Sequence, residues 1–164
     1  MDTLVMLFKW SLGLGLSLAI GCSATHHSGN QQQNTPFLHF QKTPCLGICP
    51  SYEATIMESG RIRYIGYKHV PLLDTASFEL SPQMLEELRQ DVAALEYTTL
   101  NDTYLTDWSD MPSTFTTFYE QGKEAKRIVQ EEGGPQPLLD FQQKVHTLLM
   151  GLAEQEAKDR LPLK

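Results

Sequence analysis

The 164-residue sequence has few positive charges and no recognisable catalytic motif. Thirteen Lys and Arg residues stand against twenty Asp and Glu, which gives a net charge of −7. Such a chain lacks the basic surface that neutralises phosphates, so we expect no nucleic-acid partner. It contains no G-x-S-x-G elbow, P-loop, dinucleotide fingerprint or zincin motif. A triad assembled from distant positions would leave no such motif, but we expect a non-catalytic module without a cofactor.

The sequence also lacks an apolar run long enough to span a bilayer as a helix, which takes about 20 residues. Its longest uncharged apolar stretch near the N-terminus is "WSLGLGLSLAIG", the twelve residues 10–21. That length fits the apolar region of a secretory signal. The sequence therefore predicts a signal peptide over residues 1–21. A start at Met6 would give "MLFKW", a more typical charged beginning.

The predicted signal peptide ends in "LAIGC", which resembles the lipobox of bacterial lipoproteins. The usual leucine three places before the cysteine is Ala19 here. Ala19 and Gly21 also suit ordinary signal peptidase, so a plain secreted protein with a free Cys22 is the alternative. The resemblance implies a lipid on Cys22 that anchors the chain in a membrane. Ser23, in place of Asp, implies the outer membrane, with the domain facing the periplasm.

Cysteine is scarce, with three residues in the whole chain. Lipidation of Cys22 leaves Cys45 and Cys49, an even pair in an oxidising compartment, within "PCLGICP". We expect these two to form a local disulfide, although a redox pair or a metal site are alternatives. Closing so short a loop gains about 2 kcal/mol of chain entropy.

Composition divides the rest of the chain into three parts. Residues 22–35 hold the cysteine and then "SATHHSGNQQQNT", which has no large apolar side chain and predicts a flexible tether. Residues 36–153 form one predicted domain. Residues 154–164 are charged, and we expect this tail to fray.

Hydrophobic periodicity within the domain alternates between strands and helices. "FLHFQ" and "ASFEL" predict short strands, and a hairpin is expected over "SYEATIMESGRIRYIGY" and again over "STFTTFYEQGKEAKRIVQ". One helix is expected to begin at Ser81-Pro82, with an apolar stripe through Leu88 and Val92, and a second after Gly134-Pro135. Because a lone hairpin is unstable, we predict an α+β fold in which both hairpins join one antiparallel sheet. Two helices would cover one face.

The two hairpins are alike in sequence. Sliding the chain by 62 residues places Pro50-Ser51 on Pro112-Ser113, Glu58 on Glu120 and Gly60 on Gly122. Hairpins share turn chemistry, so the likeness is suggestive only. It raises the hypothesis of a tandem ββα repeat.

The spacing of Cys45, Cys49 and Pro50 resembles the C-x-x-x-C-P motif of the Sco family of copper chaperones. That resemblance implies a thioredoxin fold and a copper site, for which His146 is the candidate third ligand. Two thiolates and an imidazole suit copper. A thioredoxin fold, however, needs a helix at the second cysteine, and "SYEATIM" after Pro50 is strand-like.

A second resemblance covers most of residues 37–150. The stretch "CLGICPSYEATIMESGRIRYIG" is similar to a family of secreted bacterial domains of unknown function, whose signature is Cys-Phe-Gly-x-Cys-Pro-x-Tyr. The matching residues are Cys45, Gly47, Cys49, Pro50 and Tyr52, with Leu46 in place of Phe; in the second half, Tyr104, Asp110 and Pro112 occupy expected positions. The resemblance implies no activity.

One further cluster has the composition of an ion site. Asp102, Asp107 and Asp110 lie in "NDTYLTDWSD", but without the spacing of a calcium-binding loop. A solvated acidic loop is the simpler interpretation.

Taken together, the signal peptide, the lipobox-like cysteine and the absence of a catalytic motif predict an envelope lipoprotein. Its domain would be a non-catalytic binding or structural module, whose partner is a protein or another envelope component. The alternative is a thiol redox or copper-handling protein that uses Cys45 and Cys49.

Overall fold

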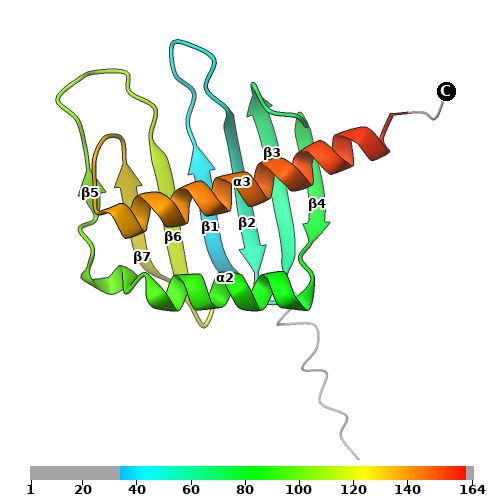
Figure 1. Cartoon of the computed structure of the whole chain (residues 1–164), viewed down its shortest axis with the longest axis horizontal. Coiled ribbons are helices and arrows are strands. Elements are labelled where there is room, and N and C mark those ends of the chain that lie inside the picture. The colour runs from blue at the N-terminus through cyan, green and yellow to red at the C-terminus, as the bar shows by residue number, and fades with distance from the viewer. Residues whose placement is uncertain (1–33, 162–164) are drawn as a thin grey trace, which may run out of the picture.

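A computed structural model describes residues 34–161. Its centre is one seven-stranded sheet in the order β4-β3-β2-β1-β6-β7-β5, crossed by two helices (Figure 1). The strands are β1 (Pro36–Lys42), β2 (Ser51–Met57), β3 (Arg61–Lys68), β4 (Asp74–Glu79), β5 (Thr103–Tyr104), β6 (Thr114–Glu120) and β7 (Lys123–Gln130). The helices are α2 (Pro82–Ala94) and α3 (Gln136–Asp159), with a short 3₁₀ turn at Tyr97–Thr99.

The predicted α+β class is confirmed. All strand pairs are antiparallel except β5 with β7, and both helices cross the same face of the sheet (Figure 1). Strand side chains that alternate toward that face are buried, as a half-covered sheet requires. The fully buried side chains include Leu38, Phe40, Tyr52, Ile56, Ile62, Tyr64, Ile128, Leu138 and Leu149.

Both predicted hairpins are present, because their turns carry the required residues. In the second, Gln121 and Gly122 have φ values of 52° and 76°, the paired positive φ of a two-residue turn that suits strand twist. In the first, Gly60 has a φ of 89°. The tandem repeat is not shown, since β4 separates the first hairpin from its helix, whereas α3 follows the second hairpin directly.

The first helix begins as its sequence predicts. The Ser81 hydroxyl accepts a hydrogen bond from the Met84 N–H at 3.2 Å, and Pro82 occupies the first helical position. Leu88 and Val92 face the core. The second helix departs from prediction at its C-terminus, because residues 154–159, expected to fray, continue α3 as far as Asp159.

The connection from β3 to β4 packs unusually close to the sheet. A Cβ added to Gly66 would lie 2.0 Å from the Leu72 carbonyl oxygen and 3.0 Å from the Tyr64 hydroxyl. Only glycine leaves room for this approach. The Tyr64 hydroxyl donates to that same Leu72 carbonyl at 3.3 Å, which holds the loop against the core.

Residues 1–33 lie outside the part of the chain that the structure describes. The predicted signal peptide, Cys22 and nearly all of the predicted tether fall there. Within residues 34–161, neither helix is both long and apolar enough to cross a membrane.

Candidate functional site

Four connections meet at one end of the sheet, where β1, β3, β5 and β7 finish (Figure 1). We name this the loop end; it consists of residues 43–50, 69–73, 105–113 and 131–135 together with the last two residues of β3, Tyr67 and Lys68. The opposite end holds the two tight hairpin turns and the start of β1 at Pro36. A seven-residue strand spans about 23 Å. The loop end is therefore separated by roughly the length of β1 from the point where residues 22–35 join the domain.

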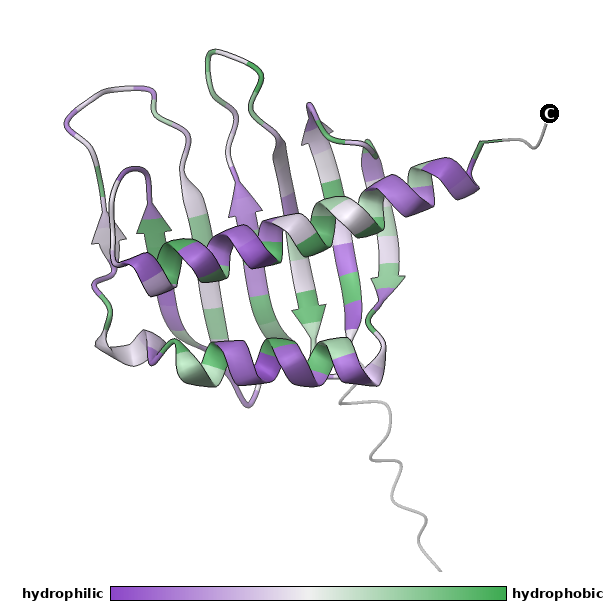
Figure 2. Ribbon diagram, viewed as in Figure 1, coloured by the Kyte–Doolittle hydropathy of each residue, from purple (hydrophilic) through white to green (hydrophobic). Residues whose placement is uncertain are grey.

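Exposed apolar side chains concentrate at the loop end. Single exposed hydrophobic residues are ordinary on a protein surface. Here, of the eight large hydrophobic residues that are exposed within residues 34–161, seven lie at the loop end and only Leu161 lies elsewhere. The seven are Leu46, Ile48, Tyr67, Leu73, Leu105, Trp108 and Met111. Figure 2 shows hydrophobic segments in the connections after β1 and β3. A concentration of this kind makes the loop end the candidate functional site of this fold.

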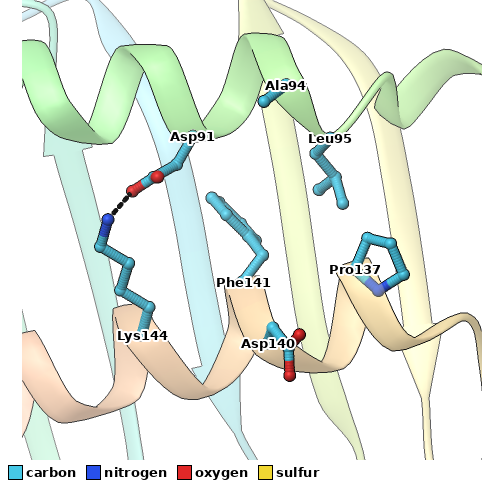
Figure 3. A pocket seen from close by; sticks show the side chains of 7 residues that line it. All are labelled: Asp91, Ala94, Leu95, Pro137, Asp140, Phe141 and Lys144. Atoms are coloured by element: carbon cyan, nitrogen blue, oxygen red, sulfur yellow. Dashed lines mark ion pairs between the residues drawn. The ribbon is translucent and has the colours of Figure 1, made fainter.

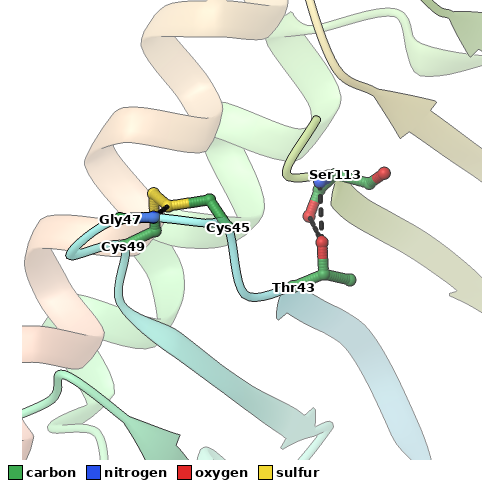
Figure 4. Close-up of a disulfide and its surroundings, with 5 residues drawn as sticks. All are labelled: Thr43, Cys45, Gly47, Cys49 and Ser113. Carbon is green, nitrogen blue, oxygen red and sulfur yellow. Dashed lines mark hydrogen bonds between the residues drawn. A yellow bond between two sulfur atoms is a disulfide. The ribbon is translucent and has the colours of Figure 1, made fainter. Parts of the chain in front are cut away.

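The most exposed of these residues are held on the disulfide loop. Cys45 and Cys49 are bonded, with their Cα atoms 5.6 Å apart (Figure 4). The Gly47 N–H points at the Cys45 sulfur, 3.2 Å away. This closed loop directs Leu46 and Ile48 outward, where they are 94% and 86% exposed. The disulfide thus keeps the Leu46 and Ile48 side chains exposed to solvent. Without the bond, the loop would be free to turn these side chains toward the protein.

The disulfide loop is tied at its base to the loop between β5 and β6. The Thr43 N–H donates to the Ser113 carbonyl at 3.0 Å, and the Ser113 N–H donates to the Thr43 hydroxyl at 2.7 Å (Figure 4). These bonds extend the β1–β6 pairing by one residue beyond each strand. The disulfide loop and the loop that carries Trp108 are therefore joined at their bases.

The loop between β5 and β6 carries Trp108, which is 76% exposed. Its shape depends on Glu131, whose carboxylate accepts hydrogen bonds from the Thr106 N–H and the Ser113 hydroxyl, each at 3.2 Å. Asp107 and Asp110 lie exposed on either side of Trp108. The apolar surface therefore has an acidic border on this side.

Beneath the disulfide loop, a polar cluster faces α3. The Tyr52 hydroxyl lies 2.7 Å from His146 Nδ1, and the Lys42 ammonium donates to the Thr114 hydroxyl at 3.1 Å. Burial raises the pKa of Tyr52 and lowers that of Lys42. Burial, followed by the charge of Lys42, lowers the pKa of His146 below 6.5. The ring is therefore neutral at pH 7, and its Nδ1 shares a hydrogen bond with the Tyr52 hydroxyl.

A hollow separates the two helices (Figure 3). It has a volume of about 210 Å³ and an apolar floor of Leu95, Pro137 and Phe141. The ion pair between Lys144 and Asp91, 2.5 Å long, crosses one side of it. The ionisable side chains that line the hollow are Asp91, Asp140 and Lys144, and two of these are paired with each other.

The structure brings some of the predicted site residues together and keeps others apart. Cys45 and Cys49 are joined, whereas His146 hydrogen-bonds to Tyr52. No group of three or more His, Cys, Asp or Glu side chains able to hold a metal occurs between residues 34 and 161. The three aspartates for which calcium binding was the alternative are therefore not gathered, and Asp102 pairs with Lys126 at 2.6 Å.

A Sco-like thioredoxin fold requires a helix after Cys49. In this structure the segment after Cys49 is the strand β2. Pro50 leads directly into β2, which pairs on both sides with antiparallel neighbours. The second cysteine therefore lies at no helix N-terminus. The physical basis for a lowered thiol pKa in that fold is absent here.

Sequence reasoning did not identify Lys42, Thr43, Ser113 or the exposed Ile48 as parts of one surface. Thr43 and Ser113 are 70 residues apart, and only the pairing of β1 with β6 brings them together. The run "LGI" between two cysteines was the available signal, because a five-residue disulfide loop has no interior in which to bury a side chain.

Comparison with known proteins places the chain in a family without assigning it an activity. No curated protein matches it. A family model described as a domain of unknown function, DUF6438, matches residues 36–149. That range includes every strand, α2 and most of α3. The chain therefore belongs to the DUF6438 family.

Proposed function

We propose that this chain is a lipoprotein of the cell envelope, anchored through Cys22, whose domain is a non-catalytic binding module. The binding surface is the loop end. One observation carries this proposal: seven exposed hydrophobic side chains share one end of the sheet, two of them on a disulfide-closed loop. A protein that leaves so much apolar surface in water gains free energy when a partner covers it.

The position of the N-terminal chain supports the same function. Residues 22–35 join the domain at Pro36, at the opposite end of the sheet. An anchor on Cys22 would therefore attach the domain at the end of the sheet that is opposite the loop end. A flexible tether of this length reaches about 20 Å, which gives the loop end access to partners at a distance from the lipid surface.

The anchor is tested with the full chain in a Gram-negative host. The parent should incorporate labelled palmitate and sediment with the outer membrane, and Cys22→Ser should lose the label and be released in soluble form. A Cys45→Ser chain, which keeps Cys22, is the matched control and should retain the label. A parent chain that carries no lipid would overturn the anchoring.

The binding surface is tested by photo-crosslinking in the same cells. A photoreactive residue replaces Leu46 or Trp108 at the loop end, or Ser77 and Leu161 as exposed control positions away from it. We expect a discrete adduct of constant mass from the two loop-end positions and none from the controls. Adducts of equal yield from all four positions, or from none, would show that the loop end is not a binding surface.

A further inference from the structure

Two parts of the loop end differ in chemistry, and a third part, at the end of β3, carries the exposed Lys68. The half built on the disulfide loop, "TPCLGICP", is uncharged. The half around Trp108 carries exposed carboxylates at Asp107, Asp110 and Glu132. Glu131, in the same half, accepts two hydrogen bonds and holds the loop in shape. A partner must therefore match an apolar centre with an acidic border on one side.

This charge distribution decides between two kinds of occupant. A membrane rich in anionic lipid would meet carboxylates beside Trp108 on a chain whose net charge is −7. Like charges repel across such an interface. A protein surface with Lys or Arg beside its own apolar residues would meet complementary charge, which speeds association and fixes orientation.

We infer that the loop end binds a protein partner that presents apolar side chains to Leu46, Ile48 and Trp108, and basic side chains to Asp107 and Asp110. This inference rests on the proposed function and specifies its partner. An exposed tryptophan surrounded by smaller contacts is typical of the residues that dominate binding energy. The joint between Thr43 and Ser113 keeps the apolar and acidic halves in a fixed relation.

The point of entry of the tether favours the same occupant. Pro36 lies about 23 Å from the loop end, the length of one seven-residue strand. The lipid anchor would place the Pro36 end of the domain nearer to the membrane. The loop end contacts that membrane only if the whole domain rotates. A protein that approaches from the other side meets the loop end directly.

The fluorescence of Trp108 can report binding at the loop end. Trp10 and Trp108 are the two tryptophans, so a full chain with Trp10→Phe and Cys22→Ser has fluorescence from Trp108 alone. Four probes are compared: an 18-residue amphipathic peptide of Leu and Lys, the same peptide with Glu for Lys, neutral phosphatidylcholine vesicles and vesicles with anionic lipid. We expect a blue shift of Trp108 emission with the Leu–Lys peptide only, weakening as salt is added.

Matched variants separate the two halves of the surface. Leu46→Ser with Ile48→Ser should weaken peptide binding at least tenfold, as loss of buried leucine-sized contacts predicts. Asp107→Asn with Asp110→Asn should weaken it about fivefold at low salt and little at high salt. Leu161→Ser, which removes an exposed leucine away from the loop end, should bind as the parent does.

The outcomes are distinct. Equal binding of the Lys and Glu peptides, or a salt-independent interaction, would overturn the basic character of the partner. A shift with vesicles and not with the Leu–Lys peptide would assign the surface to lipid. If no probe shifts the emission while the crosslinks form in cells, the inferred chemistry is wrong and the proposed function stands. If the crosslinks also fail, the binding module itself is wrong.

Discussion

At the scale of single residues, the contact between Tyr52 and His146 is the most informative. It joins the start of β2 to the middle of α3 through a bond of 2.7 Å, next to the half-buried Lys42. Desolvation and the lysine charge both favour the neutral imidazole. The histidine therefore acts as a packing residue at neutral pH, and protonation works against the fold.

The pH dependence follows from the direction of that shift. Because the pKa of His146 is below 6.5 in the folded chain, the unfolded chain takes up the proton first as pH falls. The stability that the neutral ring contributes is fully present above pH 6.5 and is lost as pH falls toward the folded pKa. We expect NMR titration of the ring protons to give a midpoint below 6.5 in the native protein and near 6.5 in urea. A native midpoint at or above 6.5 would contradict this placement.

Tyr52→Phe should make the histidine easier to protonate. The change removes the hydroxyl that is hydrogen-bonded to Nδ1 and should cost about 1 kcal/mol of unfolding free energy. If the hydroxyl stabilises the neutral ring, the pKa of His146 rises. Tyr64→Phe is the matched control, because Tyr64 is also buried and donates to the Leu72 carbonyl. It should destabilise the fold without moving the His146 titration. Equal titrations in both variants would show that the Tyr52 bond does not act on the ring.

At the scale of elements, local chemistry predicted most of the fold. Ser81 with Pro82 marked the start of α2, and Gln121-Gly122 marked the second hairpin, because caps and tight turns depend on adjacent residues. The strand β5 is two residues long and pairs in parallel with β7. It is too short to show a hydrophobic period and is not part of a hairpin, so the sequence pattern did not predict it. The C-terminus of α3 was misread because the charged residues after Glu154 concealed Ala157, which packs against the core.

Two glycines offer a paired test of how tightly the elements pack. Gly66→Ala would place a methyl group 2.0 Å from the Leu72 oxygen, so the connection after β3 must shift, and we expect a loss of about 2–4 kcal/mol. Gly151→Ala adds a methyl group with no atom within 4 Å, inside α3. It should stabilise the protein by about 0.5–1 kcal/mol. Chemical denaturation of both variants measures the difference, and a neutral Gly66→Ala would show that the loop does not pack as described.

At the scale of the whole molecule, the sequence could not reveal the loop end. It identified the pair Cys45 and Cys49 and the acidic stretch with Asp107 and Asp110 as separate features. Which connections share an end of the sheet depends on strand order. That order places β1, the first strand, between β2 and β6. Pairing between residues 38 and 118 is a long-range result that no local pattern encodes. Only the assembled sheet therefore shows that these side chains share one end of the molecule.

The disulfide should stabilise the whole domain modestly. The double change Cys45→Ser with Cys49→Ser opens a five-residue loop and should lower the free energy of unfolding by about 2 kcal/mol, leaving the fold intact. Leu46→Ser, in the same loop with the bond intact, should change stability by less than about 0.5 kcal/mol, since the side chain is 94% exposed. Urea denaturation compares the three chains. Equal stability of the double variant and the parent would show that the bond is no structural staple.

The central position of β1 also has a consequence for the order of folding. Ribosomes deliver β1 first, and β2, β3 and β4 follow at once by short connections. These four strands can pair early, but the other edge of β1 must wait for β6, which begins at Thr114. A nascent chain of about a hundred residues would therefore expose the edge of β1 that later pairs with β6. The unpaired backbone groups of this edge could pair with the wrong strand. We expect the half-made domain, rather than the finished one, to be the state most in need of a chaperone.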